Sequence, residues 1–67
     1  MPYVNIKITR EGVTAEQKHR LVAGVTRLLQ EELGKNPLTT VVVIDEVDTD
    51  NWGIGGELVT ARRERGM

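Results

Sequence analysis

The chain lacks the residues from which small proteins usually build covalent or metal cross-links. Its 67 residues include no cysteine, no serine and a single histidine, His19. These absences exclude disulfides, thiolate metal sites, a cysteine nucleophile and a Ser–His pair, so we interpret His19 as a surface residue. Because a domain of this size buries only about 60% of its unfolded surface, it usually needs another source of stability. The remaining source is association, and we expect an oligomer without metal.

The sequence also lacks an excess of one charge and any long apolar run. Nine basic and ten acidic residues are interleaved, giving a net charge of -1 and a pI of about 5.7. A nucleic-acid-binding protein typically carries a basic stripe instead. No apolar run approaches the roughly 20 residues of a membrane-spanning helix, and the start of the chain has no signal-peptide pattern. We therefore expect a cytoplasmic protein with neither nucleic acid nor membrane as a partner.

Three segments of the sequence predict a β-α-β unit. Residues 3–9 alternate between apolar and polar, which is typical of a half-buried strand. Thr14 and Gln17 form a capping-box pattern before a helix with one apolar face, and Gly34 marks its end. Residues 41–47 predict a second strand. Since a long helical crossover joins them, the two strands should be parallel and the connection right-handed.

Two features of this unit predict close packing. The run Val41 to Ile44 is continuously apolar, as in strands covered on both faces. One helix covers only one face of a two-stranded sheet, so a second subunit should cover the other. Gly24 lies inside the predicted helix, where glycine costs about 1 kcal/mol relative to alanine. We interpret it as a point of close approach between the helix and a strand.

The last third of the chain predicts a hairpin and a tail. Residues 52–56, Trp-Gly-Ile-Gly-Gly, indicate a tight turn, and residues 58–60 a short strand-like piece. The glycines match neither a dinucleotide-binding fingerprint nor a phosphate loop, because the flanking elements and the Lys-Ser/Thr ending are missing. We expect residues 1–67 to form a single domain, with 62–67 as a loose, charged tail.

Pro2 is the sharpest chemical feature. Removal of Met1 would leave a secondary amine at the start of a strand. An α-amino group has a pKa of about 7.7 to 8.0, and a secondary amine starts higher; burial and a nearby cation both lower it. A pKa near neutral is what a general base needs. The alternative interpretation is that proline at this position only permits removal of methionine.

Arg10 and Trp52 are the second group of candidate site residues. Arg10 follows the first strand, about 23 Å from Pro2 along an extended chain. It could reach the Pro2 of a neighbouring subunit, or it could be a solvated loop residue. Trp52 is the only tryptophan and the chain has no phenylalanine, so it could form a pocket wall or anchor a subunit contact. The acidic residues between positions 45 and 50 are interpreted as a solvated edge.

These motifs together resemble the 4-oxalocrotonate tautomerase family over residues 2–62. The resemblance rests on Met1-Pro2, the alternating first strand, residues 14–18 at the helix start, residues 37–41 before the second strand, and residues 52–58. It implies an α+β, tautomerase-like βαβ subunit with a C-terminal hairpin that dimerises, with dimers assembling into a homohexamer. It also implies an amino-terminal proline that moves a proton between the carbon and oxygen of an enol acid without a cofactor. The family's type enzyme ketonises 2-hydroxymuconate. Pro2 matches the catalytic proline, and Trp52 falls where the family usually has a pocket-lining phenylalanine.

The sequence departs from this family at two substrate-binding positions. Family enzymes for dicarboxylates use two arginines there, whereas this chain has Val13 and Val42. Arg10 could supply the role of the first arginine from a shifted position.

Three hypotheses about function follow. The first is a keto–enol tautomerase with Pro2 as base and then acid, Arg10 of a neighbouring subunit as electrophile and Trp52 as pocket wall. The second is a hydratase or dehalogenase with Pro2 as acid. The third is a non-catalytic subunit paired with a related chain.

Overall fold

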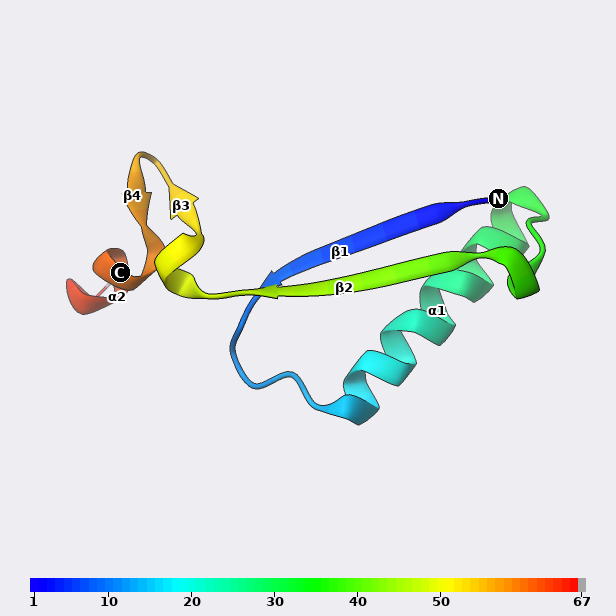
Figure 1. The fold of residues 1–67 in the computed structure, drawn as a ribbon, viewed down its shortest axis with the longest axis horizontal. Coiled ribbons are helices and arrows are strands. Elements are labelled where there is room, and N and C mark those ends of the chain that lie inside the picture. Colours follow the sequence, from blue (N-terminus) through cyan, green and yellow to red (C-terminus); the bar gives the residue numbers. More distant parts are fainter. Residues whose placement is uncertain (67) are drawn as a thin grey trace.

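The first strand, the helix and the second strand form where the sequence patterns predict them (Figure 1). The structure is a computed structural model, and it describes residues 1–66. Its elements follow one another as β1 (Tyr3–Thr9), α1 (Ala15–Leu33), the 3-10 helix η1 (Pro37–Thr39), β2 (Val41–Val47), the 3-10 helix η2 (Thr49–Asn51), β3 (Gly53–Ile54), β4 (Glu57–Leu58) and α2 (Val59–Glu64). The fold is α+β, as expected.

Local capping explains why α1 begins and ends as predicted. The Thr14 hydroxyl accepts a hydrogen bond from the Gln17 amide at 3.1 Å, and the Gln17 side chain accepts one from the Thr14 amide at 2.9 Å. At the other end Gly34 is left-handed, with φ 65°, and its N–H donates to the Gln30 carbonyl at 3.0 Å. Both ends are therefore fixed by residues within a turn of the helix.

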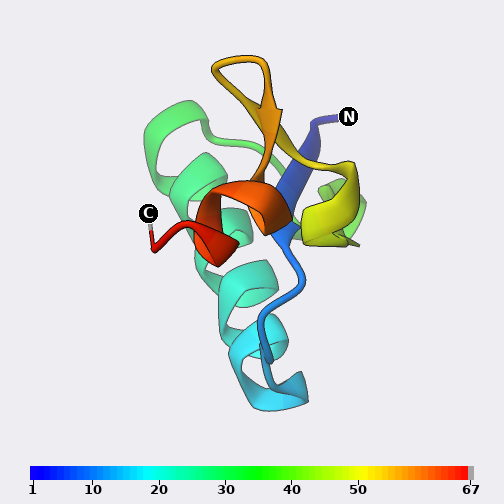
Figure 2. The same ribbon diagram turned by 90° about the vertical axis from the view of Figure 1, so that its left-hand side faces the viewer.

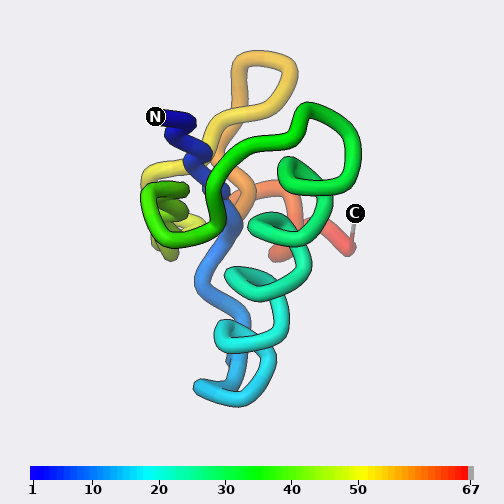
Figure 3. Tube along the Cα trace, turned by 90° about the vertical axis from the view of Figure 1, so that its right-hand side faces the viewer, coloured from blue at the N-terminus to red at the C-terminus, as the bar shows by residue number. Residues whose placement is uncertain are grey.

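The two long strands are parallel, with Tyr3 opposite Val41 and Thr9 opposite Val47. Helix α1 lies on one side of both strands in two opposite end-on views (Figures 2 and 3). An ion pair of 2.5 Å between Lys18 of α1 and Glu46 of β2 identifies the face that the helix covers. Because side chains alternate along a strand, Asp45 lies on the opposite, outer face.

The outer face of the sheet is uncovered in the single chain. Tyr3 is 65% exposed, Val41 43% and Val43 36%, and Val59 is the one buried hydrophobic residue in the described part of the chain. The predicted cover on both faces of β2 is therefore not supplied by the chain itself. The prediction for Gly24 is wrong within one chain, because a Cβ added there would meet nothing within 4 Å.

The shape of the molecule is extended for its size. Its radius of gyration is 15.4 Å, whereas a compact domain of this length has one of about 11 Å. Its accessible surface is 4977 Å², about 700 Å² more than the roughly 4,250 Å² of a folded monomer of this mass. The chain thus carries unburied surface that a self-contained domain would not have.

The C-terminal segment folds into a small lobe at one end of the sheet. Strands β3 and β4 form an antiparallel hairpin with Gly53 opposite Leu58. The expectation of a strand-like piece at 58–60 and of a loose tail after it was wrong in part, because helix α2 begins at Val59 and runs to Glu64. Non-local contacts explain the helix: the Val59 amide donates to the Trp52 carbonyl at 2.8 Å, and the hydroxyls of Thr60 and Thr49 lie 2.6 Å apart. Residue 67 of the predicted tail lies outside the described residues.

None of the helices in residues 1–66 has the combined length and apolar character that crossing a bilayer would require.

Candidate active site

Pro2 is held at the amino end of the sheet. Its carbonyl accepts a hydrogen bond from the Val41 amide at 3.0 Å, which extends the β1–β2 ladder by one residue. Its side chain is half-buried, while Met1 before it is 94% exposed. As long as Met1 is attached, the Pro2 nitrogen is an amide and cannot accept a proton. Pairing with β2 therefore holds Pro2 in place, and removal of Met1 determines whether its nitrogen can accept a proton.

Arg10 lies at the carboxyl end of the sheet and is anchored there. Its amide donates to the Val47 carbonyl at 2.8 Å. Its guanidinium forms an ion pair of 3.0 Å with Asp48 and donates to the Glu46 carbonyl at 3.3 Å. The side chain is exposed. Arg10 is thus an exposed loop residue whose charge already has a carboxylate partner.

Trp52 lies at the same end as Arg10, where η2 leads into β3. It is half-buried and belongs to the C-terminal lobe through its hydrogen bond with Val59. Figure 1 shows this lobe and the amino terminus at opposite ends of the molecule. The seven residues of β1 span about 23 Å, so one chain brings Arg10 and Trp52 to one end and leaves Pro2 at the other.

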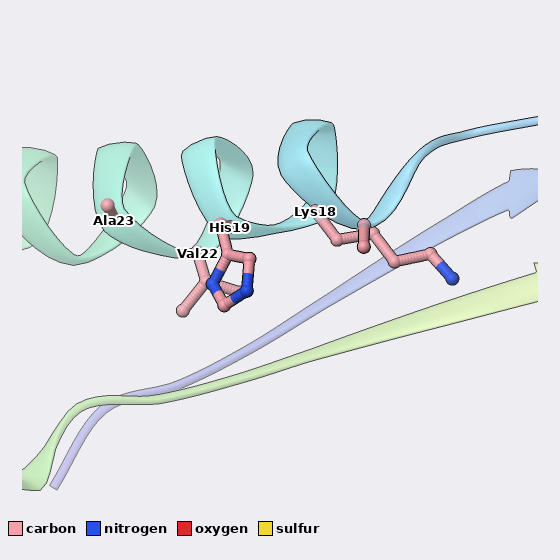
Figure 4. Close-up of a pocket in the computed structure, with 5 residues that line it drawn as sticks. Lys18, His19, Val22 and Ala23 are labelled. Atoms are coloured by element: carbon pink, nitrogen blue, oxygen red, sulfur yellow. The ribbon is translucent and has the colours of Figure 1, made fainter.

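The valines at the two family arginine positions lie apart. Val42 pairs with Val4 near the amino end of the sheet. Val13 lines a shallow groove with residues of β1 and α1: Ile8, Gln17, Arg20 and Leu21. A second groove runs along α1, where His19 and Val22 lie on the side facing the strands (Figure 4). His19 is exposed, as predicted. Neither groove is lined by Pro2, Arg10 or Trp52.

The acidic residues after β1 and along β2 are engaged with cations rather than simply solvated. The Lys18 ammonium, which bonds to Glu46, lowers the pKa of that carboxyl. Hydrogen bonds from Asn5 and then Lys7 lower the pKa of Asp45. In the loop after β1, the pKa of Glu11 is lowered by the Thr9 hydroxyl and by Arg63, whose guanidinium lies 2.5 Å away. These pairs connect β1, β2, α1 and α2.

The C-terminal arginines are ordered into the lobe, which the sequence did not indicate. Arg63 pairs with Glu11, and Arg65 pairs with Glu57 at 2.5 Å. Arg62 instead donates from Nη1 to the carbonyl of Ile54 at 3.4 Å. The hairpin makes these contacts possible, because it folds residues 53–58 back against α2.

Within residues 1–66, no group of three or more histidine, aspartate or glutamate side chains is placed to hold a metal ion.

Comparison with known proteins links this arrangement to one family. The family model described as Tautomerase enzyme matches residues 2–62. A relative from Dickeya dadantii, named Probable tautomerase K2, is 72% identical over 65 residues, covering 97% of each chain. The 2-hydroxymuconate tautomerase of Bacillus subtilis is 40% identical over 57 residues, covering 85% of this chain and 90% of that protein.

Solved structures share the fold over nearly the whole chain. DmpI from Helicobacter pylori superposes with a TM-score of 0.88 at 48% identity, covering 94% of this chain and 97% of that one. A structure reported for trans-3-chloroacrylic acid dehalogenase activity has a TM-score of 0.74 at 32% identity, over 85% and 97% of the two chains. A heterohexamer 4-oxalocrotonate tautomerase from Chloroflexus aurantiacus, 23% identical over 90% and 95%, shares the fold with a TM-score of 0.80.

Proposed function

Because the chain belongs to the tautomerase family, we propose that it is a cofactor-independent isomerase that interconverts the enol and keto forms of an unsaturated 2-hydroxy acid. The observation that carries the proposal is Pro2, half-buried and hydrogen-bonded at the start of β1 within the matched segment. Relatives named tautomerases support the reaction class.

The proposed chemistry needs one group that both takes and gives a proton. After removal of Met1, the Pro2 amine takes the proton of the enol hydroxyl and returns it to a carbon of the double bond. No atom is gained or lost, so no further reactant is required. The amine has to be largely unprotonated near neutral pH, and a desolvated position lowers its pKa in that direction. Trp52 supplies apolar surface for that purpose.

A complete site requires at least two copies of the chain, since one copy separates Pro2 from Arg10 and Trp52. Two copies related by a two-fold axis, with their sheets antiparallel, place the carboxyl end of one beside the amino end of the other. The unburied surface of about 700 Å² is close to the roughly 800 Å² per partner of a standard interface. We therefore propose a homo-oligomer, most simply a hexamer built as a trimer of dimers.

The test of this function compares the wild type with Pro2→Ala on phenylenolpyruvate. Alanine also permits removal of Met1, so the variant has a free primary amine. It differs from the wild type in lacking the pyrrolidine ring that makes the amine secondary. General acid–base catalysis contributes about 10²- to 10⁴-fold, and we expect a loss of at least about 100-fold. Mass spectrometry of the active protein should show Met1 absent. Equal rates for the two proteins, or an active species that retains Met1, would remove Pro2 from the mechanism.

A second candidate is the addition of water to an unsaturated acid or its dehalogenation, with Pro2 as the acid. The likeness to the structure reported for dehalogenase activity supports it. Titration of the Pro2 nitrogen by ¹⁵N NMR separates the candidates: a pKa near neutral supports the tautomerase, and one well above about 8 supports a function with Pro2 as the acid.

Val13 and Val42, at the positions of the family's arginines, favour a third candidate, which is a non-catalytic subunit. Absence of turnover by an oligomer that has lost Met1 would support it. We place the protein in the cytoplasm, which cell fractionation tests.

A further inference from the structure

A carboxylate that is taken out of water is usually paired with a cation, and the arginines at the end of the molecule that carries Trp52 differ in what they bind. Arg10 pairs with Asp48, and Arg63 pairs with Glu11. Arg65 likewise pairs with Glu57. Arg62 is the exception among these four arginines, because its side chain bonds to a backbone carbonyl and not to a carboxylate. Its guanidinium therefore has no carboxylate partner among the described residues.

We propose that Arg62 is the residue that binds the carboxylate of the substrate, and that the substrate carries one carboxylate. This inference rests on the proposed function and names the substrate class for it. It moves the role of substrate-binding cation from Arg10, whose guanidinium is occupied by Asp48, to an arginine of α2.

The lobe holds the Arg62 guanidinium in place while leaving it able to bind an anion. Its Nη1 donates to the Ile54 carbonyl at 3.4 Å, which uses one of the five N–H donors of an arginine. A Cβ on Gly55, at the hairpin turn, would lie 3.4 Å from the same Nη1, and Gly55 has φ 61°. Glycine at this turn gives the half-buried guanidinium room against the hairpin.

Arg62 belongs to the same small unit as Trp52. The Val59 amide bonds to the Trp52 carbonyl, and Arg62 follows Val59 by three residues, one turn of α2. Ile54, to which Arg62 bonds, follows Trp52 by two residues. An assembly that places the Trp52 side chain beside the Pro2 of another copy therefore also carries the Arg62 guanidinium into that neighbourhood.

The number of arginines without a carboxylate partner predicts how many carboxylates the substrate carries. Arg10, Arg63 and Arg65 are each paired with a carboxylate, which leaves Arg62 as the one guanidinium at this end that a ligand could pair with. Asp50 and Glu64 add two further carboxylates to η2 and α2, so a second anion would meet negative charge. A dicarboxylate would bring a second anion without a partner, and burying an unpaired charge is costly. Arg27 and Lys35 also form no ion pair with the described residues, but both are exposed, on or just after α1. We expect phenylenolpyruvate to be preferred over 2-hydroxymuconate.

The experiment measures kcat and KM for phenylenolpyruvate with wild type, Arg62→Ala, Arg62→Lys and the control Arg27→Ala. Hydrogen bonds to charged groups correspond to roughly 10- to 100-fold in binding. We expect Arg62→Ala to raise KM by that factor with a smaller change in kcat, and Arg62→Lys to raise it less. Arg27→Ala, which removes an exposed arginine of equal charge, should match the wild type. Size-exclusion chromatography checks that each variant assembles.

A second substrate separates charge recognition from general damage to the lobe. On the methyl ester of phenylenolpyruvate, which has no carboxylate, Arg62→Ala and wild type should have equal KM. An unchanged KM for the acid, or an equal rise for acid and ester, would overturn the role of Arg62. Wild-type preference for 2-hydroxymuconate would overturn the single carboxylate.

The outcome for Arg62 is distinguishable from that for the proposed function. If Pro2→Ala is inactive and Arg62→Ala has the kcat and KM of the wild type, the proposed tautomerase function is supported and the inference about Arg62 fails. If the wild type turns over neither acid, binding of phenylpyruvate is followed by the fluorescence of Trp52, the only tryptophan. Weaker binding by Arg62→Ala than by Arg27→Ala then supports the carboxylate site, and equal binding refutes it.

Discussion

Val43→Lys tests whether the outer face of the sheet is buried by another copy of the chain. Val43 is 36% exposed in the single chain and lies on the same face as Asp45, which already bonds to Asn5 and Lys7. The introduced ammonium would therefore find no free carboxylate beside it. If the face is open to water, the substitution should change stability by no more than about 0.5 kcal/mol.

If another copy of the chain covers this face, Val43→Lys should have a much larger effect on stability. Burying an ammonium without a partner costs several kcal/mol, and symmetry repeats that cost in every copy. At about 1.4 kcal/mol per factor of ten, a cost of roughly 4 kcal/mol weakens association by about three orders of magnitude. Sedimentation velocity and thermal unfolding, each measured over a wide concentration range, should show a smaller and less stable particle.

Gln30→Lys is the matched control, because it adds the same charge at an exposed position of α1. It should keep the mass and the unfolding temperature of the wild type. The reasoning is refuted if Val43→Lys behaves like this control, or if the wild type sediments as a monomer whose unfolding temperature does not depend on concentration.

Two further predictions concern Gly24 and the ion pairs. Gly24→Ala should raise the free energy of unfolding by up to about 1 kcal/mol, because the added methyl group has open space in the chain. Urea denaturation measures this change. A loss of stability would mean that another subunit packs there. Glu11, Asp45 and Glu46 have lowered pKa values in the folded chain. Their ionised forms therefore stabilise the fold above their ordinary pKa values, and this stabilisation is lost as the pH falls. Unfolding temperature should therefore drop between about pH 5 and pH 3, and Glu46→Gln should flatten part of that dependence; an unchanged pH profile would refute the role of this pair.

The sequence was sufficient to predict the elements whose limits depend on neighbouring residues. Alternation over residues 3–9, the Thr14–Gln17 box and Gly34 act within a turn or a strand, so their consequences could be worked out from spacing alone. The parallel pairing followed from the length of the crossover. These rules need no knowledge of what lies across the fold.

The C-terminal lobe could not be predicted in this way, because non-local contacts hold it. Val59 begins a helix where its amide meets the Trp52 carbonyl, and Arg62 gains its anchor only when the hairpin presents the carbonyl of Ile54. The sequence could identify Arg10 as a candidate cation, but it could not show that Asp48 occupies it. Composition marked the C-terminal arginines as charged, not as ordered.

The incomplete core and the incomplete site have the same physical origin. A chain with one long helix and two long strands covers one face of its sheet and leaves the other in water. The two ends of these parallel strands also lie far apart. Pro2 stands at one end, and Trp52 and Arg62 stand at the other. In the proposed homo-oligomer, a second copy that covers the sheet also supplies the missing end of the site, so stability and catalysis would depend on the same contact. The proposal therefore predicts that dissociation alone abolishes activity, without any change to Pro2, Trp52 or Arg62.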